Sequence, residues 1–535
     1  MIESYLTKKA SQYYHKVMAQ LNSNKRGYEV TKNNKQSYDS YEASQQILNP
    51  TIANNNLRLQ FENGEITYSF ERYNDSDKFD ELTHEQRKQV KKALDAWSDV
   101  VKIKFIEVGK NTTSAIRFFA TSNIENGKFS YISKQDMNLD SIPCFFNIQI
   151  HSEILQPKKG NYGQMVLVHQ IGHVVGLSHP GNYTNIVIDN ESPHYLQWEL
   201  KKSSYWKNTD YIEDSRQYTV MSNWSERYTN GDFGGFYPCS PLLDDITASQ
   251  SLHGANMEAR KGNTVYGFHS NTNIDYYSIN NDDDKNITCT IWDAGGNDTL
   301  DFSAYYQDQQ INLNPGSFSN VGGLKGNISI AKKVIIENAI GGRGNDIIIG
   351  NEFNNIINGG AGSDIIYGNL GQDILWGGDN INPITFSKNI AKIHSYVLFT
   401  PPYQESQQPE HIVRTNNHKE LFSPSLENET LSSNIFVYTD FEESLPTSPD
   451  MIMDFRTNKD KIDLSAINAN HNDANNGKNF IHFVLEFNGV PGETVISYNN
   501  RDHFHYISIN ADDDLKPDFV IKIAANIVTA HDFIL

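Results

Sequence analysis

Three histidines stand at a spacing that lets their side chains meet. In the segment VHQIGHVVGLSHPGNY, His169 and His173 are four residues apart, so on a helix they share one face and can hold one metal ion. Gly176 tolerates the backbone angles with which a chain leaves a helix, and this lets His179 return as a third ligand. Three neutral imidazoles leave a fourth zinc position open for water, which is the arrangement of a catalytic rather than a structural zinc site.

A second pattern repeats every nine residues later in the chain. GGRGNDIII, GGAGSDIIY and, with Asn369 in place of one glycine, GNLGQDILW follow the pattern GGxGxDxUx, in which U is a large apolar residue such as Ile348 or Ile366. Each turn offers backbone carbonyls and a carboxylate at a bend that glycine tolerates, so stacked turns can enclose calcium in oxygen ligands. NEFNNIIN keeps Ile357 but lacks the glycines and the aspartate, and we expect this turn to bind calcium poorly. The predicted ligands in the repeats are Gly342, Gly344, Asp346, Gly360, Gly362, Asp364, Gly371 and Asp373.

The elements that position these residues are predicted from periodicity and composition. Thr83 and Gln86 form a capping-box pattern, and Val90, Leu94 and Trp97 then fall on one helical face that should pack on a sheet. The first half of the chain therefore indicates a mixture of α and β structure. A short helix is predicted over about residues 37–48, and strands over about 57–73, 102–108, 115–120 and 145–150.

Composition excludes several classes of function. A net charge of −20 over 535 residues argues against nucleic acid or an anionic membrane as partner and favours a bound cation. Cys144, Cys239 and Cys289 lie far apart in sequence, which predicts neither a disulfide framework nor a thiolate zinc site. No stretch approaches the roughly 20 apolar residues of a membrane span. The N-terminus MIESYLTKKASQYYHKVM lacks the apolar core of a signal peptide.

The histidine motif resembles the metzincin signature HExxHxxGxxH, in the form found in the serralysin family of secreted bacterial proteases. The segments ALDAWSDV, GLSHPGNY, EDSRQYTVMS, PLLDDI, WDAGGNDTLDFS and KIDLSAI resemble serralysin segments in the same order. The resemblance implies an α+β metzincin-like zinc peptidase domain followed by an all-β parallel β-roll or β-sandwich, with one zinc ion and several calcium ions. Met221 matches the methionine whose tight turn lies beneath the histidines in this family.

The resemblance also implies how the chain is divided and where the domains join. Residues 1–35 form a leading segment for which a propeptide or a loose arm would both fit, and residues 380–433 form an insertion without a recognisable motif. The peptidase domain is expected over 36–256, the β-roll over 257–379 and a C-terminal β domain over 434–535. A calcium position joining the domains is implied at Arg260, Gly262, Thr264, Asp293, Gly295, Gly296, Asp298, Thr299 and Glu337.

Two departures from the family pattern bear on activity. Gln170 stands where the family has the glutamate that takes a proton from zinc-bound water, and an amide cannot accept that proton. Asn223 stands where the family has a tyrosine that stabilises the oxyanion, and its side chain is too short to take that place. We therefore expect zinc binding with strongly impaired peptide hydrolysis.

Three hypotheses remain open from the sequence. The chain is a natural pseudopeptidase, a working peptidase whose glutamate has been replaced, or a calcium-dependent extracellular binding or toxin module with a vestigial zinc site. The terminal HDFIL resembles the C-terminal type I secretion signal of the family, although a plain hydrophobic terminal strand also fits. The implied partners are an extracellular protein or peptide substrate and the type I secretion apparatus, and the protein is expected to be a monomer.

Overall fold

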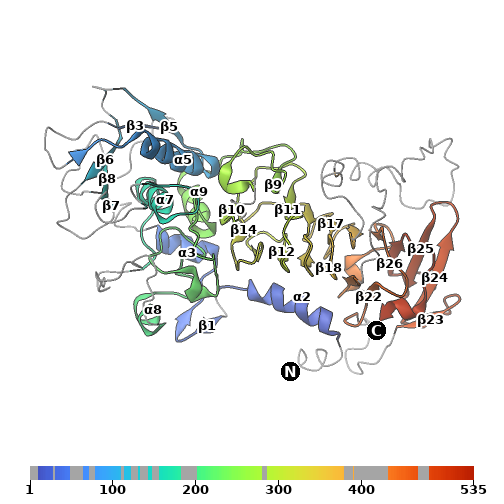
Figure 1. The fold of residues 1–535 in the computed structure, drawn as a ribbon. Coiled ribbons are helices and arrows are strands. Elements are labelled where there is room, and N and C mark those ends of the chain that lie inside the picture. Colours follow the sequence, from blue (N-terminus) through green and yellow to red (C-terminus); the bar gives the residue numbers. More distant parts are fainter. Residues whose placement is uncertain are drawn as a thin grey trace.

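The computed structural model describes two linked halves, a helix-rich half and a strand-rich half, and Figure 1 shows them side by side. The described residues are 10–27, 30–48, 64–70, 79–109, 112, 114–121, 130–132, 142–147, 153, 156–181, 202–279, 286–378, 390, 432–467 and 481–535. Across these residues, every helix is either too short or too polar to cross a membrane.

The helix-rich half is built around two helices, α5 and α7. The predicted capping box is present at α5, because Thr83 accepts from the Gln86 backbone and the Gln86 side chain accepts from the Thr83 backbone. The apolar face of α5 is buried, and the Trp97 indole donates to the Val168 carbonyl of α7 at 2.9 Å. This contact fixes the helix that carries the first two histidines. The helices are α3 (Ser40–Ile47), α5 (His84–Val100), α7 (Tyr162–Val174), α8 (Lys202–Asn208) and α9 (Leu243–His253).

A mainly parallel sheet accompanies these helices. Its strand order is β5-β3-β6-β8-β7, with β4 paired to β6, and β7 runs antiparallel to β8 at one edge. The predicted strands at 102–108 and 115–120 are confirmed as β5 and β6, whereas residues 148–150 of the predicted strand 145–150 lie outside the described residues. The strands are β3 (Glu65–Ser69), β4 (Phe79–Asp80), β5 (Lys104–Glu107), β6 (Ile116–Thr121), β7 (Ser130–Ile132) and β8 (Ile142–Asn147).

The strand-rich half is a parallel β-roll whose turns follow the nine-residue repeat. Ile347 pairs with Ile365, and Ile356 pairs with Ile374, so strands two repeats apart are neighbours in one sheet. The eighth residues Ile348 and Ile366 are fully buried between the two sheets. The strands of this part are β9 (Val265–Gly267), β10 (Cys289–Ile291), β11 (Thr299–Asp301), β12 (Gln310–Asn312), β13 (Phe318–Ser319), β14 (Ile328–Ile330), β15 (Asn338–Ile340), β16 (Ile347–Ile349), β17 (Ile356–Asn358), β18 (Ile365–Tyr367) and β19 (Ile374–Trp376).

The same two sheets continue beyond the insertion. β20 pairs in parallel with β18, and β21 pairs in parallel with β19, so the strands before and after residues 379–431 share hydrogen bonds. Apart from Ile390, residues 379–431 lie outside the described residues, so the role of the predicted insertion stays open. The later strands are β20 (Ile435–Val437), β21 (Asp450–Ile452), β22 (Lys461–Asp463), β23 (His482–Val484), β24 (Glu493–Asn499), β25 (Phe504–Ile509), β26 (Phe519–Ile523) and β27 (Phe533–Ile534).

The leading segment contacts both halves of the chain. Helix α2 (Gln12–Ser23) lies along the roll in Figure 1, where Val17 packs against Ile365 and Ile435 of the six-stranded sheet. Arg26 then enters the helix-rich half and donates to both carboxylate oxygens of Asp244 at 3.0 and 2.9 Å. A two-stranded ribbon, β1 (Thr31–Lys32) with β2 (Lys35–Gln36), follows it. Residues 1–9 lie outside the described residues.

The buried ion pair of Arg26 and Asp244 yields the first prediction. Both side chains are almost fully buried, and the guanidinium also lies 4.6 Å from the Tyr218 ring centre. Arg26→Met leaves the buried Asp244 carboxylate without its ion-pair partner, so the free energy of unfolding should fall by about 3–5 kcal/mol. Urea unfolding at pH 7 measures this loss.

The control is Arg227→Met, because Arg227 and its partner Asp232 are each about half exposed. Its loss should change the free energy of unfolding by less than about 1 kcal/mol. Equal effects of the two substitutions would show that the buried pair does not fasten the leading segment.

Candidate metal centre

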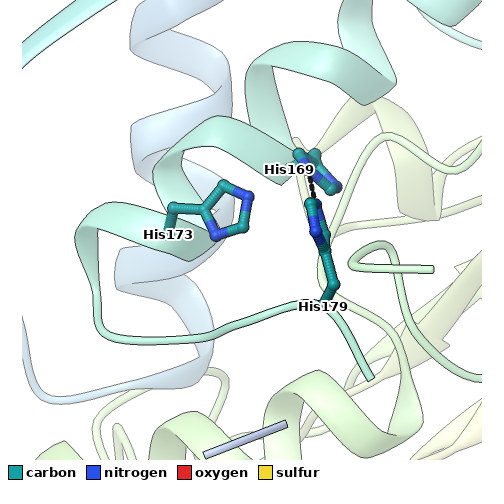
Figure 2. Close-up of side chains that lie close together, drawn as sticks. All are labelled: His169, His173 and His179. Carbon is teal, nitrogen blue, oxygen red and sulfur yellow. Dashed lines mark hydrogen bonds between the residues drawn. The ribbon is translucent and has the colours of Figure 1, made fainter. Parts of the chain in front are cut away.

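The three predicted histidines meet in space. His169 and His173 lie on α7, which begins after Asn161, whose side chain accepts from the Gln164 backbone. Gly176 leaves the helix with a φ of +101°, and the chain then brings His179 back to the other two rings. The ligating atoms lie within 4.8 Å of one another, and Figure 2 shows the rings turned toward each other. The Nε2 atoms of His169 and His179 are 3.2 Å apart, close to the roughly 3.3 Å expected for two nitrogens on one tetrahedral zinc.

Backbone carbonyls set the ring orientation of two of the histidines. The Nδ1 of His169 lies 2.8 Å from the Val220 carbonyl, and the Nδ1 of His173 lies 2.9 Å from the Leu177 carbonyl. Since a carbonyl can only accept, each Nδ1 carries the proton and each Nε2 presents its lone pair to the centre. Burial lowers the pKa of His169 to about 3 and also lowers that of His173, so both rings stay neutral at physiological pH. This donor set fits zinc.

Met221 lies beneath α7 as the family pattern implies. It is fully buried, and a Cβ placed on Gly172 would lie 2.5 Å from its sulfur and 3.1 Å from Cζ2 of Trp97. Gly172, between the two helical histidines, is therefore required for close packing. It was not identified from the sequence, because glycine within a helix carries no signal of what faces it.

Asp245 holds the turn that orients His169. Its carboxylate accepts from the Thr219 hydroxyl at 2.5 Å and from the backbone N–H groups of Val220 and Leu242 at 2.8 and 2.9 Å. Val220 in turn supplies the carbonyl that His169 meets. Burial raises the pKa of Asp245 to about 7, against the lowering effect of these hydrogen bonds. The segment PLLDDI contained Asp245, but only the structure connects it to the metal centre.

Gln170 and Asn223 occupy the two positions where catalytic groups are expected. Gln170 follows His169 on α7 and is buried, and its Oε1 has no hydrogen-bond partner among the described residues. Asn223 is half-buried, and its backbone carbonyl accepts from the guanidinium of the buried Arg216 at 3.2 Å. Arg216 also lies over the Tyr237 ring at 5.4 Å, so it fixes the chain after Met221. Its contribution was not foreseen from the sequence.

The predicted calcium position between the domains is assembled in part. Asp298 accepts from the Thr264 backbone at 2.8 Å, and its own backbone donates to Glu337 at 2.7 Å. Burial and the nearby Asp293 raise the pKa of Asp298 to about 8, and burial raises that of Glu337 to about 7. The Oδ2 of Asp298 is buried and unpartnered among the described residues. Such a group of oxygens fits a calcium ion.

Other predicted ligands of this position take different roles. The Arg260 side chain pairs with Asp99 and donates to the Trp292 carbonyl, so only its own carbonyl is left for a cation. A Cβ on Gly296 would lie 2.6 Å from the Gly262 carbonyl, which shows how closely these two loops approach. The remaining predicted residues lie beside them: Gly295 donates to Asp293, and Thr299 begins β11.

The repeat turns stack as predicted. A Cβ on Gly360 would lie 2.2 Å from the Gly342 carbonyl, and a Cβ on Gly362 would lie 2.1 Å from the Gly344 carbonyl, so only glycine fits. Gly371 has a φ of +123°, which also favours glycine. The turns bring Asp346 next to Asp364, whose carboxylate accepts from the Asp346 backbone at 2.8 Å, and Asp373 accepts in the same way from Asn355 at 2.7 Å.

Acidic side chains alone do not form a cage at these turns. Over the described ranges, the three histidines make up the sole group of at least three His, Cys, Asp or Glu side chains close enough to share one ion. Calcium in the roll would therefore rely on backbone carbonyls as well as on the carboxylates.

The connection from Asp245 through Val220 to His169 yields the second prediction. Asp245→Asn turns one acceptor oxygen into an N–H₂ group facing backbone donors, so the carbonyl that orients His169 should shift. Zinc affinity should fall by about 10- to 100-fold, as for other residues that support metal ligands. Competition with a chelating zinc indicator at pH 7.5 measures it. Asp232→Asn, at the half-exposed carboxylate that pairs with Arg227, is the control and should bind zinc like the parent.

Comparison with known proteins agrees with this geometry. The family profile described as Matrixin matches residues 60–203, and the profile described as Peptidase M10 serralysin C terminal matches residues 255–535. Serralysin A of Dickeya chrysanthemi is 37% identical over 98% of this chain and 96% of its own length, and Serralysin C of the same organism is 36% identical with the same coverage. Serralysin of Proteus mirabilis is 36% identical over 88% of this chain and 87% of its own length. Two profiles in the expected order and relatives of nearly full length show that the chain belongs to the serralysin family of metzincin-type metalloproteases.

Proposed function

We propose that this protein is a secreted serralysin that holds zinc at His169, His173 and His179 and binds extracellular polypeptides, but hydrolyses them only weakly. The observation that carries the proposal is the buried Gln170 amide beside the three converging rings. Zinc bound there would polarise a peptide carbonyl and lower the pKa of a bound water. The residues around it decide how much of that chemistry leads to cleavage.

Gln170 can orient a water molecule but cannot take its proton. Its side-chain oxygen accepts hydrogen bonds, yet an amide lacks the proton affinity of a carboxylate. Helix α7 therefore has no base at this position to take the proton that water releases during the attack and to deliver it to the leaving amine. This loss accounts for a factor of about 10² to 10⁴ in rate.

Asn223 adds a second loss. Arg216 holds the Asn223 backbone through its carbonyl, so the short side chain cannot move outward to replace a phenol. A hydrogen bond to the developing oxyanion would then be missing, which costs about 10²- to 10³-fold in rate where such a donor has been removed.

Polypeptide binding requires none of these groups. An extended chain can add to a free sheet edge through backbone hydrogen bonds. The described part of the segment FFNIQI offers no such edge, because it lies in β8, which is covered by β6 on one side and by β7 on the other. Among the described strands, the free edge on that side belongs to β7, and we place the polypeptide there.

Secretion fits the order in which the roll would close. Phe533 and Ile534 of the terminal HDFIL form β27, paired with Ile462 and Asp463 of β22. A C-terminal signal for the type I apparatus would therefore be read before this pairing forms. Low calcium inside the cell would keep the roll open until export, since buried carboxylates repel one another without the cation.

The alternative hypothesis of a binding or toxin module treats the zinc site as vestigial. The retained ring geometry and the carbonyls that orient His169 and His173 favour a site that still takes metal. The two hypotheses separate on zinc content and on the response to restoring the glutamate.

The third prediction concerns Gln170→Glu. With zinc present, hydrolysis of casein by the unaltered protein should be very slow, and the substitution should raise it by about 10² to 10⁴ because a general base returns. Gln170→Ala, which removes the side chain without adding a base, is the control and should stay at the low rate. Rapid hydrolysis by the unaltered protein contradicts the proposal. No gain in the glutamate variant, despite one bound zinc, assigns the protein to the pseudopeptidases.

The fourth prediction concerns calcium and pH. Burial raises the pKa of Asp346 and of Glu337 to about 7, and burial with Asp293 raises that of Asp298 to about 8. These folded-state values lie above the unfolded ones, so the metal-free fold holds extra protons up to about pH 8 and loses stability as pH rises through this range. Calcium must displace those protons, so its stabilising effect should grow from pH 5.5 to pH 8.

Thermal unfolding with and without calcium across this range measures the effect. Asp298→Asn removes the group with the highest of these values and should flatten the pH dependence. A calcium effect of the same size at pH 5.5 and pH 8 would contradict the assignment of these carboxylates as ligands.

A further inference from the structure

The sheets of the roll carry apolar residues on their outer faces as well as between them. Successive side chains of a strand point to opposite faces of its sheet, so an outer face in contact with water is expected to be polar. In β19, Leu375 points into the roll, whereas Ile374 and Trp376 on either side of it point outward. Both outward side chains are nevertheless buried, at 3% and 2% exposure. The outer face of this sheet is therefore covered.

The outward residues of four neighbouring strands form one apolar patch, which we call the outer stripe. Ile356 of β17 pairs with Ile374 of β19, and Ile374 pairs with Met451 of β21, so these side chains lie side by side. Across β15, β17, β19 and β21, the outer stripe consists of Ile340, Ile356, Ile374, Trp376 and Met451. All of them are buried, and one further buried side chain, Ile390, packs in the same cluster.

Ile390 is the member of this cluster that does not belong to the sheet. It lies within the insertion, is helical and is 4% exposed. The sequence around it, NPITFSKNIAKIHSYVLF, predicts a helix with one apolar face, since apolar residues recur at intervals of four, three and four. These residues are Phe386, Ile390, Ile393 and Val397. Lys388 and Lys392 fall on the other side of such a helix.

The six-stranded sheet shows how the opposite face of the roll is covered. Its outward residues Ile365 and Ile435 are buried in one cluster with Val17 of α2. Tyr13 and Leu21, one helical turn before and after Val17, pack against the same cluster. Figure 1 shows α2 lying along this side of the roll. A helix from outside the roll thus covers one sheet with its apolar face, and the ten-stranded sheet requires an equivalent cover.

We propose that residues 383–399 of the insertion dock on the outer stripe through the apolar face that contains Ile390, as α2 docks on the six-stranded sheet. The burial of the whole stripe and the presence of Ile390 in its cluster support this assignment. The insertion then has a role of its own, since the residues added after β19 cover the sheet to which β19 belongs. This role is separate from the zinc and polypeptide binding proposed above.

The test uses the full-length protein with calcium and zinc and follows the fluorescence of Trp376, which should stay buried only while the insertion covers it. The chain has six tryptophans, so the emission of Trp376 is obtained as the difference between each protein and its Trp376→Phe variant. Ile390→Asp places a charge against the outer stripe, so this emission should shift to longer wavelength. Lys392→Asp introduces the same side chain away from the apolar face and is the matched control, which should emit like the parent.

A second variant separates docking from the effect of a buried charge. Replacement of residues 383–399 by a glycine and serine segment of equal length should cause the same shift. A synthetic peptide of residues 383–399, added in excess, should reverse the shift by occupying the outer stripe. Trp376 emission that neither change moves overturns the proposal, as does a shift that the peptide fails to reverse.

Hydrogen exchange of the parent needs no substitution and carries the test if the variants do not fold. The amides of residues 386–397 should exchange much more slowly than those of an unstructured chain, because a docked helix protects them. Exchange at the rate of an unstructured chain overturns the proposal. Zinc is counted in every sample and should equal that of the parent, so a failure of the proposed zinc site is distinguished from a failure of docking.

Discussion

A carboxylate buried away from water must be given a countercharge or a set of donors, and both halves of this protein are arranged around that requirement. In the helix-rich half, Asp244 receives Arg26 and its neighbour Asp245 receives three donors, one of which belongs to Val220. Because Val220 also orients His169, the metal centre depends on a charge that lies outside it. In the roll, the carboxylates outnumber the cations that the chain supplies.

The substitution at position 170 follows the same rule. A glutamate at the buried position 170, beside the three imidazoles, would be a buried negative charge whose compensation comes from bound zinc. The Gln170 amide is neutral with or without the metal, so it needs no compensating charge. The same amide cannot act as the general base. Stability and activity thus respond to one change in opposite directions, as is common where catalytic groups are held in unfavourable surroundings.

The sequence predicted those features that repeat or that lie within a few residues of one another. The histidine spacing, the capping box at Thr83 and the glycine turns are local patterns, and each was found in the structure. Gly172 and Asp245 were missed because Met221 and Val220, the residues that give them their roles, lie tens of residues away along the chain. Arg216 was missed because neither its bond to the Asn223 carbonyl nor its contact with the Tyr237 ring leaves a pattern in the sequence. Asp450 carries no local signal at all, since it becomes comparable with the repeats only once β21 is placed beside β19.

The contrast between sequence distance and spatial register explains how the roll accommodates its insertion. The bond from Asn355 to Asp373 spans 18 residues, and the equivalent bond from Asp373 to Asp450 spans 77, yet both are 2.7 Å long. The cost of closing a loop grows only slowly with its length, so the added residues weaken this pairing little. The register is fixed by hydrogen bonds in which the backbone N–H of the sixth residue of one turn donates to a side-chain oxygen of the sixth residue in the next turn of the same sheet. The apolar residues that point inward beside them support this register. An insertion at a turn is therefore tolerated as long as the next strand still places its sixth-position residue in the same hydrogen-bonding register.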